Sequence, residues 1–341
     1  MATLGRWIKR LGAAFALMLL MLGGLLTLAL SNAPGLSAIT GSSAEPARQA
    51  GQVRSVFLGT SSLMFTDGTT TWMLDGFLSR PALSQVMFTR LEVNRARVDE
   101  AASHAFERLG VSPGLLAVLV AHSHYDHAMD APYLAQRFGA RVIGSPSTRQ
   151  IALGQNCPDS LIQVFKAGDR IALGDFTVEV IGSAHAPTGY TGGVVSTPLR
   201  LPAHALAMKE GGSFAFAVYH RSHGLQPLAL IQPSAGFVPG QNAPFKADTV
   251  YLGIGGLGKL TEQQVAQYWA NVVAAPQAKR VLIIHWDDFT QPLMRDGLET
   301  ALQPMPYAVD RMDRSLPWLK TLAQTGGQRL DLLQAWQVTQ H

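Results

Sequence analysis

The sequence predicts a mixed α/β fold, and three observations carry this prediction. Its 341 residues are 47% hydrophobic and 15% charged, which is typical of a folded chain with one large core or two modest ones. Short apolar, β-rich runs alternate with segments of helical spacing along most of the chain. Histidines stand directly after several of these apolar runs. Such polar side chains at strand ends indicate a site at one edge of a sheet.

The first 30 residues differ from the rest. Residues 11–30 contain no charged side chain and would span about 30 Å as a helix, enough to cross the apolar core of a bilayer. Arg6, Lys9 and Arg10 precede them, so the positive-inside rule places everything after residue 31 on the exported side. We predict that residues 1–30 form a basic region with a membrane-spanning or signal segment, in a single-pass protein of the cell membrane. Cleavage as a signal peptide is the alternative, which would leave a secreted or periplasmic protein.

Residues 31–52 are rich in Ser, Ala, Gly and Pro, which predicts a flexible linker before a folded domain over residues 53–341. The formal net charge is +4, but the three basic residues of the N-terminal segment account for most of it, so the domain is near neutral. A neutral domain does not favour nucleic acid as a partner. The single cysteine cannot form an internal disulfide. The sequence carries no signal for the oligomeric state.

The folded part is predicted to begin with a β-hairpin around the turn signal Asp67-Gly68. A β-α-β-α-β order follows, and then an antiparallel meander of short strands broken by glycine. The second half alternates strands with a long helix and closes with a helix and a strand. The predicted strands are 53–65, 70–77, 115–121, 141–144, 161–165, 170–173, 176–181, 213–219, 228–232, 249–252, 280–285 and 329–336, and the predicted helices are 99–109, 128–138, 261–275 and 315–324.

The apolar run 115–121 ends in the motif His122-Ser123-His124-Tyr125-Asp126-His127. In an extended chain His122 and His124 point to the same side, so they can share one metal ion. Asp126 and His127 fall where the chain turns into the next helix, so they can serve a second ion. Imidazole and carboxylate suit zinc or a similar first-row metal. The motif contains no thiolate, which favours a catalytic site over a closed structural one.

Two single histidines complete the pattern. His185 follows the predicted strand 176–181, and His285 ends the strand 280–285. Each would be unremarkable alone. Three strand ends that all carry imidazoles can converge at one edge of a layered β structure, and His185 is then the third ligand that the first ion lacks.

A glycine-rich stretch, Gly253-Ile254-Gly255-Gly256-Leu257-Gly258, matches the spacing G-x-G-x-x-G of dinucleotide-binding loops. The elements around it do not form a repeated βαβ order, and no acidic residue follows at the expected distance. We therefore predict a tight turn that lets chain segments pack closely.

The motif His122 to His127, followed by His185 and His285 in this order, resembles the metallo-β-lactamase superfamily of hydrolases, and the element order is similar over residues 53–336. The turn at Asp75 is also similar to an early strand-end aspartate of that superfamily. The resemblance implies a four-layer αββα sandwich that holds two metal ions. It assigns one ion to His122, His124 and His185, and the other to Asp126, His127 and His285.

The sequence departs from the superfamily at one place. An aspartate that bridges both metals is usual after a strand between the last two histidines, but here the strand 228–232 ends in Gln232-Pro233-Ser234. We therefore expect tight binding at the three-histidine site and weaker binding at the other. Gln232, Asp287 or Asp288 are possible substitutes, and the alternative is an empty second site.

The chemistry that follows is hydrolysis. Zn²⁺, with Fe or Mn also possible, lowers the pKa of a bound water from about 16 to about 7 and polarises a carbonyl or phosphoryl oxygen. Asp126 would orient the hydroxide or receive its proton. The sequence thus predicts a metallo-hydrolase, of enzyme class EC 3, that cleaves an ester, lactone, amide or phosphodiester bond in a small-molecule substrate. The alternatives are an iron-dependent oxidoreductase on the same fold and a non-catalytic metal-binding protein.

Overall fold

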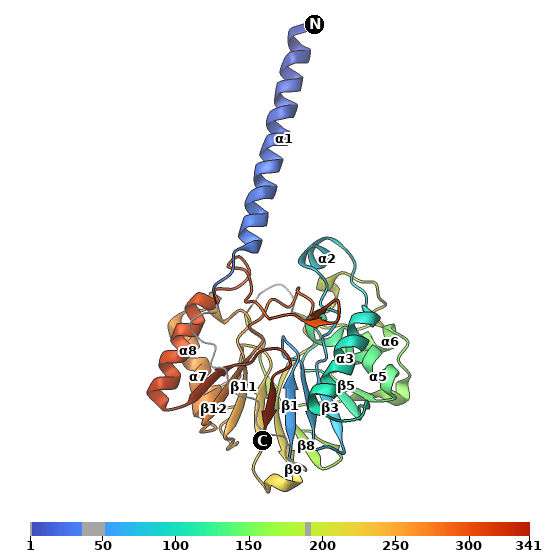
Figure 1. Ribbon diagram of the computed structural model, residues 1–341, viewed down its shortest axis with the longest axis vertical. Helices are drawn as coiled ribbons and strands as arrows, with labels where there is room; N and C mark the ends of the chain where they lie inside the picture. Colours follow the sequence, from blue (N-terminus) through green and yellow to red (C-terminus); the bar gives the residue numbers. More distant parts are fainter. Residues whose placement is uncertain (1, 36–51, 188–191) are drawn as a thin grey trace.

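The computed structural model describes residues 2–35, 52–187 and 192–341. Two seven-stranded sheets form the centre of the molecule. Helices α3, α5 and α6 lie on one outer side of the sheets, and α7 and α8 lie on the other (Figure 1). The predicted mixed α/β fold with a layered β core is confirmed.

The first sheet has the strand order β16-β1-β2-β3-β4-β5-β6. Its pairs are antiparallel from β16 to β3 and parallel from β3 to β6. The parallel strands β4 and β5 are short runs of mostly buried side chains, as expected for strands covered on both faces, whereas β6 at the edge is more open. The strands are β1 (Arg54–Phe57), β2 (Leu63–Thr66), β3 (Thr71–Leu74), β4 (Ala117–Leu119), β5 (Arg141–Gly144), β6 (Ile162–Val164) and β16 (Val338–Gln340).

The second sheet has the order β15-β12-β11-β10-β9-β8-β7. It is antiparallel from β7 to β10 and parallel from β10 to β15. A separate hairpin is formed by β13 (Met294–Arg295) and β14 (Leu298–Glu299). The strands of the sheet are β7 (Arg170–Leu173), β8 (Phe176–Ser183), β9 (Ser213–His220), β10 (Ala229–Gln232), β11 (Thr249–Gly253), β12 (Arg280–Ile284) and β15 (Arg329–Leu332).

The longer helices follow clear sequence signals. The Asn94 side chain caps α3 by accepting from the Arg97 N–H at 3.2 Å, and Thr261 caps α7 in a capping box with Gln264. The α-helices are α1 (Ala2–Ser31), α2 (Leu83–Phe88), α3 (Arg95–Leu109), α4 (Tyr125–Ala128), α5 (Ala131–Phe138), α6 (Pro146–Gly154), α7 (Glu262–Trp269) and α8 (Met312–Gly326). Short 3₁₀ turns are η1 (Asp159–Leu161), η2 (Ala205–Ala207), η3 (Arg221–His223) and η4 (Leu257–Lys259), and η5 (Ala270–Ala274) is a π-helical turn.

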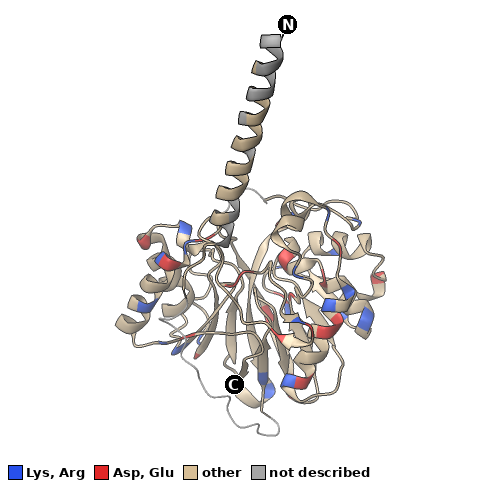
Figure 2. Cartoon of the chain, turned by 45° about the horizontal axis from the view of Figure 1, so that its top comes forward, with Lys and Arg blue, Asp and Glu red and all other residues tan. Residues whose placement is uncertain are grey.

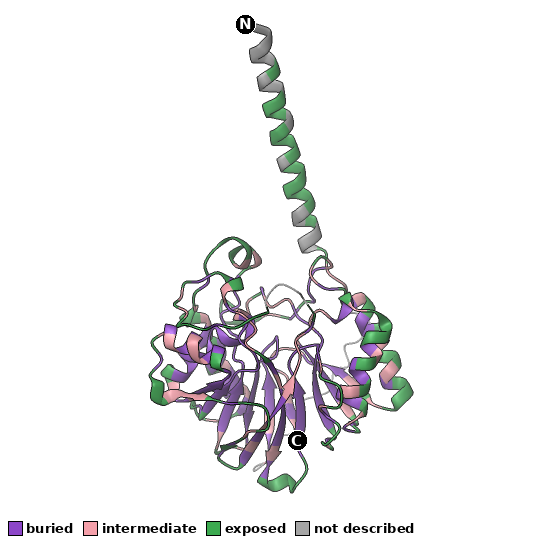
Figure 3. Cartoon of the chain, turned by 180° about the vertical axis from the view of Figure 1, so that it is seen from behind, coloured by how far each residue is buried: buried purple, intermediate pink, exposed green. Residues whose placement is uncertain are grey.

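The core lies between the two sheets and under the helices. Figure 3 shows buried residues along the strands and exposed ones along the outer helix faces, and Figure 2 shows that charged side chains gather on those helices. Aromatic rings join the sheets: Trp72 of β3 stacks on Phe65 of β2 at 4.7 Å between ring centroids and meets Phe176 of β8 edge-on at 6.0 Å. The site loops are thus carried by a rigid, apolar support.

Several elements differ from the prediction. The run 53–65 forms two strands, β1 and β2, because Gly59 and Thr60 adopt positive φ angles of 79° and 52° and turn the chain between them. The strand predicted over 161–165 pairs with β5 in the first sheet, so the meander starts only at β7. Strand β16, which closes the first sheet beside β1, was not predicted.

The N-terminal segment forms the single helix α1, which projects from the sandwich (Figure 1). Within the described residues, no helix combines the length and apolar character needed to cross a membrane, so the predicted membrane-spanning segment is not supported. Most of the predicted linker, residues 31–52, lies outside the described residues. At the end of α1, the Asn32 carbonyl accepts a hydrogen bond from the Tyr307 N–H at 2.9 Å.

Candidate metal centre

The six predicted ligands lie at one edge of the two sheets. The motif His122 to His127 follows β4 of the first sheet and runs into α4, whereas His185 follows β8 and His285 follows β12 of the second sheet. The structure brings them together as two groups of three, within each of which the donor atoms lie within 4.8 Å of one another: His122 with His124 and His185, and Asp126 with His127 and His285.

The first group consists of imidazoles only. Nε2 of His122 lies 3.1 Å from Nδ1 of His124, and the His185 ring centroid lies 4.6 Å from that of His124. Nδ1 of His185 lies 2.6 Å from the Ala186 carbonyl oxygen, which can only accept a hydrogen bond. Nδ1 therefore carries the proton, and Nε2 keeps the lone pair that can bind a metal. Two nitrogen ligands at about 2.1 Å from a tetrahedral zinc ion are roughly 3.4 Å apart, so the spacing fits such an ion.

The second group combines a carboxylate with two imidazoles. Oδ2 of Asp126 lies 3.6 Å from Nε2 of His127 and 3.5 Å from Nε2 of His285. Nε2 of His127 is buried and has no hydrogen-bond partner among the described residues. A buried nitrogen of this kind is costly unless a ligand satisfies it. The donor set and this orphaned atom therefore fit a second first-row metal ion.

Asp75 orients His127. Its Oδ2 lies 2.8 Å from Nδ1 of His127 and also accepts from the Ser61 hydroxyl at 2.5 Å, while its Oδ1 accepts from the Ala121 N–H at 2.8 Å. The bond to Nδ1 fixes the tautomer in which Nε2 is free to bind a metal. Asp75 is the strand-end aspartate that the sequence resemblance indicated. It holds the His127 ring in place on the side away from Nε2.

Burial and the neighbouring charges set the protonation states. Burial, followed by the adjacent imidazoles, holds the pKa of His122 well below its ordinary value, and it lowers the pKa of His185 to about 4. Burial opposes the charge of Asp126, but the imidazoles of His127 and His285 outweigh it and hold the pKa of that carboxyl below its ordinary value. At neutral pH these three residues thus offer lone pairs and a negative charge, the forms that bind cations.

The glycine-rich stretch packs against the site. A Cβ atom on Gly255 would lie 2.6 Å from Nδ1 of His285, and one on Gly253 would lie 2.3 Å from the Pro233 carbonyl oxygen. The predicted role of this stretch, a tight turn that permits close packing, is confirmed. Its particular use is to leave room for the His285 ring.

The proposed substitutes for a bridging carboxylate are engaged elsewhere. Asp287 forms a buried ion pair with Arg80, and Oδ1 of Asp288 accepts from the Thr290 hydroxyl at 2.6 Å. The Gln232 amide nitrogen donates to the carbonyls of Ser234 and Gly236 at 2.9 and 2.8 Å, which shapes the loop after β10.

On the same loop Ser234 lines the site, and its Oγ accepts from the Ala186 N–H at 3.1 Å. Sequence reasoning named Gln232 because it ends the strand. Ser234, which lines the cavity, lies two positions further along, and its place depends on the path of the loop.

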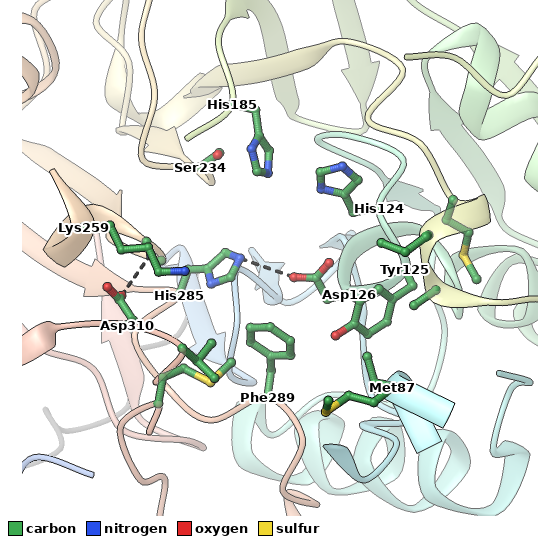
Figure 4. A pocket seen from close by; sticks show the side chains of 18 residues that line it. Met87, His124, Tyr125, Asp126, His185, Ser234, Lys259, His285, Phe289 and Asp310 are labelled. Atoms are coloured by element: carbon green, nitrogen blue, oxygen red, sulfur yellow. Dashed lines mark hydrogen bonds and ion pairs between the residues drawn. The ribbon is translucent and has the colours of Figure 1, made fainter. Parts of the chain in front are cut away.

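A cavity of about 460 Å³ opens onto both groups, within the range of small-molecule sites. His124, His185, Asp126 and His285 lie at its floor, with Lys259 and Asp310 at one side and Met87 and Tyr125 at the other (Figure 4). No sequence pattern indicated Lys259, Phe289 or Met87 as cavity residues, because they come from three separate loops or short helices.

Comparisons with known proteins agree with this picture. No family model matches the sequence. A metal-dependent hydrolase of Chloroflexus aurantiacus is 26% identical over 110 residues, which cover 32% of this chain and 44% of that protein, so the match spans less than half of the relative.

Solved structures also resemble the chain. A possible metal-dependent hydrolase from Veillonella parvula superposes with a TM-score of 0.50 and 13% identity, over 85% of this chain and all of that one. The metallo-β-lactamase fold protein YhfI from Bacillus subtilis gives a TM-score of 0.47 at 12% identity, with 85% of this chain and all of the other covered. At these identities the likeness concerns the fold.

Proposed function

Because the chain has the metallo-β-lactamase fold and that superfamily's histidine and aspartate motif, we propose that it is a metal-dependent hydrolase of a small-molecule substrate. The observation that carries the proposal is the convergence of six imidazole and carboxylate side chains from both sheets, of which His124, Asp126, His185 and His285 line one cavity. The relative's description as a metal-dependent hydrolase supports the same reaction class.

Two groups of residues would hold the metal. His122, His124 and His185 form the stronger site, because all three are imidazoles and two of them are nearly fully buried. Zinc suits this donor set best and, when bound, supplies a nucleophile at neutral pH and a Lewis acid for the attacked carbonyl or phosphoryl group. The second group has one carboxylate and no bridging partner, so we expect it to bind more weakly.

Asp126 is the residue that we assign to orienting the attacking water. Its carboxylate is 7% exposed and lines the cavity, so it can contact a water molecule there. The lowered pKa keeps it negatively charged at neutral pH, because His127 and His285 stabilise that charge. It can therefore orient the attacking water by accepting a hydrogen bond from it, while the lowered pKa makes it a weak base for complete proton transfer.

Metal analysis and hydrolysis assays on the same preparations test the proposal. We expect His122→Ala and His124→Ala to lose both bound zinc and turnover on any active member of a panel of lactones, β-lactams, thioesters and phosphodiesters. His104→Ala, which changes a histidine outside the two groups, is the matched control. Unchanged zinc stoichiometry in the two site variants would refute the assignment, and iron with visible absorption in the native protein would favour an oxidoreductase.

A further inference from the structure

We propose that the cavity selects substrates with an unbranched aliphatic chain beside the bond that is cleaved. This inference rests on the proposed hydrolase function and adds the class of substrate to it. It is carried by the lining of the cavity, by the exposure of two of its side chains and by the position of the charged side chains that are not metal ligands.

The lining away from the metal ligands is mainly apolar. Val86 and Met87 come from α2, and Leu206 and Met208 come from the segment around η2. These segments are far apart in the sequence, yet both turn apolar side chains toward the same cavity. A site for a purely polar substrate would not need this surface.

Two of these side chains are unusually open for their type. Leu206 is 59% exposed and Met87 is 48% exposed. Exposed apolar side chains that share one concave surface mark a place where an apolar partner binds. Met87 is also unbranched and flexible, which lets it adapt to a chain rather than to one rigid shape.

Besides the metal ligands, the charged side chains of the lining gather at one side of the cavity, next to the apolar Val309. Lys259 and Asp310 lie at one side of the cavity, and Met87 lies at the opposite side, with Asp126 and His285 between them (Figure 4). A substrate whose scissile bond sits at Asp126 would thus extend one part along the apolar side and the other along the polar side. An aliphatic acyl or alkyl chain on one side and a polar group on the other satisfies both surfaces.

Chain length gives a direct measurement. Burying one methylene group stabilises binding by an amount that corresponds to about a fourfold change in affinity. We would bind dansyl-labelled undecanoic acid to the full chain. We would then measure how well straight-chain fatty acids of increasing length displace this probe. The measurement would be made on zinc-loaded and chelator-treated protein, so that it does not depend on turnover.

We expect the Kd to fall about fourfold per methylene until the cavity is filled, in both metal states. Leu206→Asp and Met87→Asp should each weaken the longest acids by at least tenfold, because a carboxylate would meet the chain. The matched control is Leu225→Asp, which changes a leucine that is 95% exposed and does not line the cavity. Circular dichroism would show that all three variants are folded.

The outcomes separate this inference from the hydrolase proposal. A Kd that does not change with the length of the acid would overturn the inference that the cavity binds an aliphatic chain, even if short esters are hydrolysed. Equal weakening of acid binding by Leu225→Asp would overturn it as well. Tighter binding of phenyl-substituted acids of the same carbon number would overturn it in favour of an aromatic substrate. A steep length dependence without any hydrolysis would support the inference and contradict the hydrolase.

Discussion

Gly255 leaves the space that His285 occupies, and this makes Gly255→Ala a sharp test of the second metal group. The new Cβ would lie 2.6 Å from Nδ1 and 2.9 Å from Cε1 of His285, whereas ordinary contacts begin near 3.4 Å. The ring cannot retreat with its backbone, because the His285 N–H donates to the Thr60 carbonyl at 2.5 Å and its φ is already 52°. We therefore expect the ring to shift by roughly 0.8 Å, well beyond the ~0.2 Å tolerance of a metal–ligand distance.

The expected result is the loss of one metal ion and not of both. Zinc affinity at the second group should fall by about 10- to 100-fold, while the three-histidine group keeps its ion. Zinc content after equilibration at stepped free zinc concentrations measures the two sites separately. Gly114→Ala is the control, because a Cβ there would meet nothing within 4 Å. Two unchanged binding steps in Gly255→Ala would show that the His285 ring is not a ligand or is not held where the structure places it.

Three further changes test the support of the site and of the fold. Asp75→Asn should lower zinc affinity at the second group about tenfold by weakening the bond that orients His127, and an unchanged titration would count against that role. Arg80→Met should lower the free energy of unfolding, measured in urea, by about 3–5 kcal/mol, because it leaves the buried Asp287 unpaired. The double variant with Asp287→Leu should recover part of this free energy, and no recovery would contradict the explanation. Burial lowers the pKa of His341 to about 3 in the folded protein, so stability from its neutral form is complete above about pH 6.5 and is lost as the pH falls. Because His341 is only partly buried, between pH 7.5 and about 4.5 the native protein should lose roughly 1–3 kcal/mol relative to His341→Phe, and the absence of any pH-dependent difference would argue against this explanation.

The sequence predicted elements with a clear local signal more closely than elements that depend on a distant partner. The motif after the run 115–121 is followed by a tight turn and a helix, and the strands 141–144 and 170–173 have the predicted bounds. These segments carry strong local signals, namely continuous apolar runs bounded by glycine or histidine. Strand β16 carries little such signal, because its pairing with β1 depends on a partner that lies far away in the sequence.

The residues of the site divide in the same way, into those that a local pattern predicts and those that depend on distant contacts. The spacing of His122, His124 and His127 depends on local geometry, so the sequence could place them together. Ser234 and Lys259 could not be assigned in this way, because their positions follow from the paths of two loops. The engagement of Asp287 by Arg80 is likewise a contact between segments more than 200 residues apart, which no local pattern reports.

The hydrogen bond between Asn32 and Tyr307 connects the end of α1 with the segment 305–309, and Met305 and Val309 of that segment line the cavity. The N-terminal helix is therefore attached to one side of the cavity. A shortened protein that begins after residue 32 would lack this hydrogen bond. Ligand binding by such a protein should be compared with that by the intact chain.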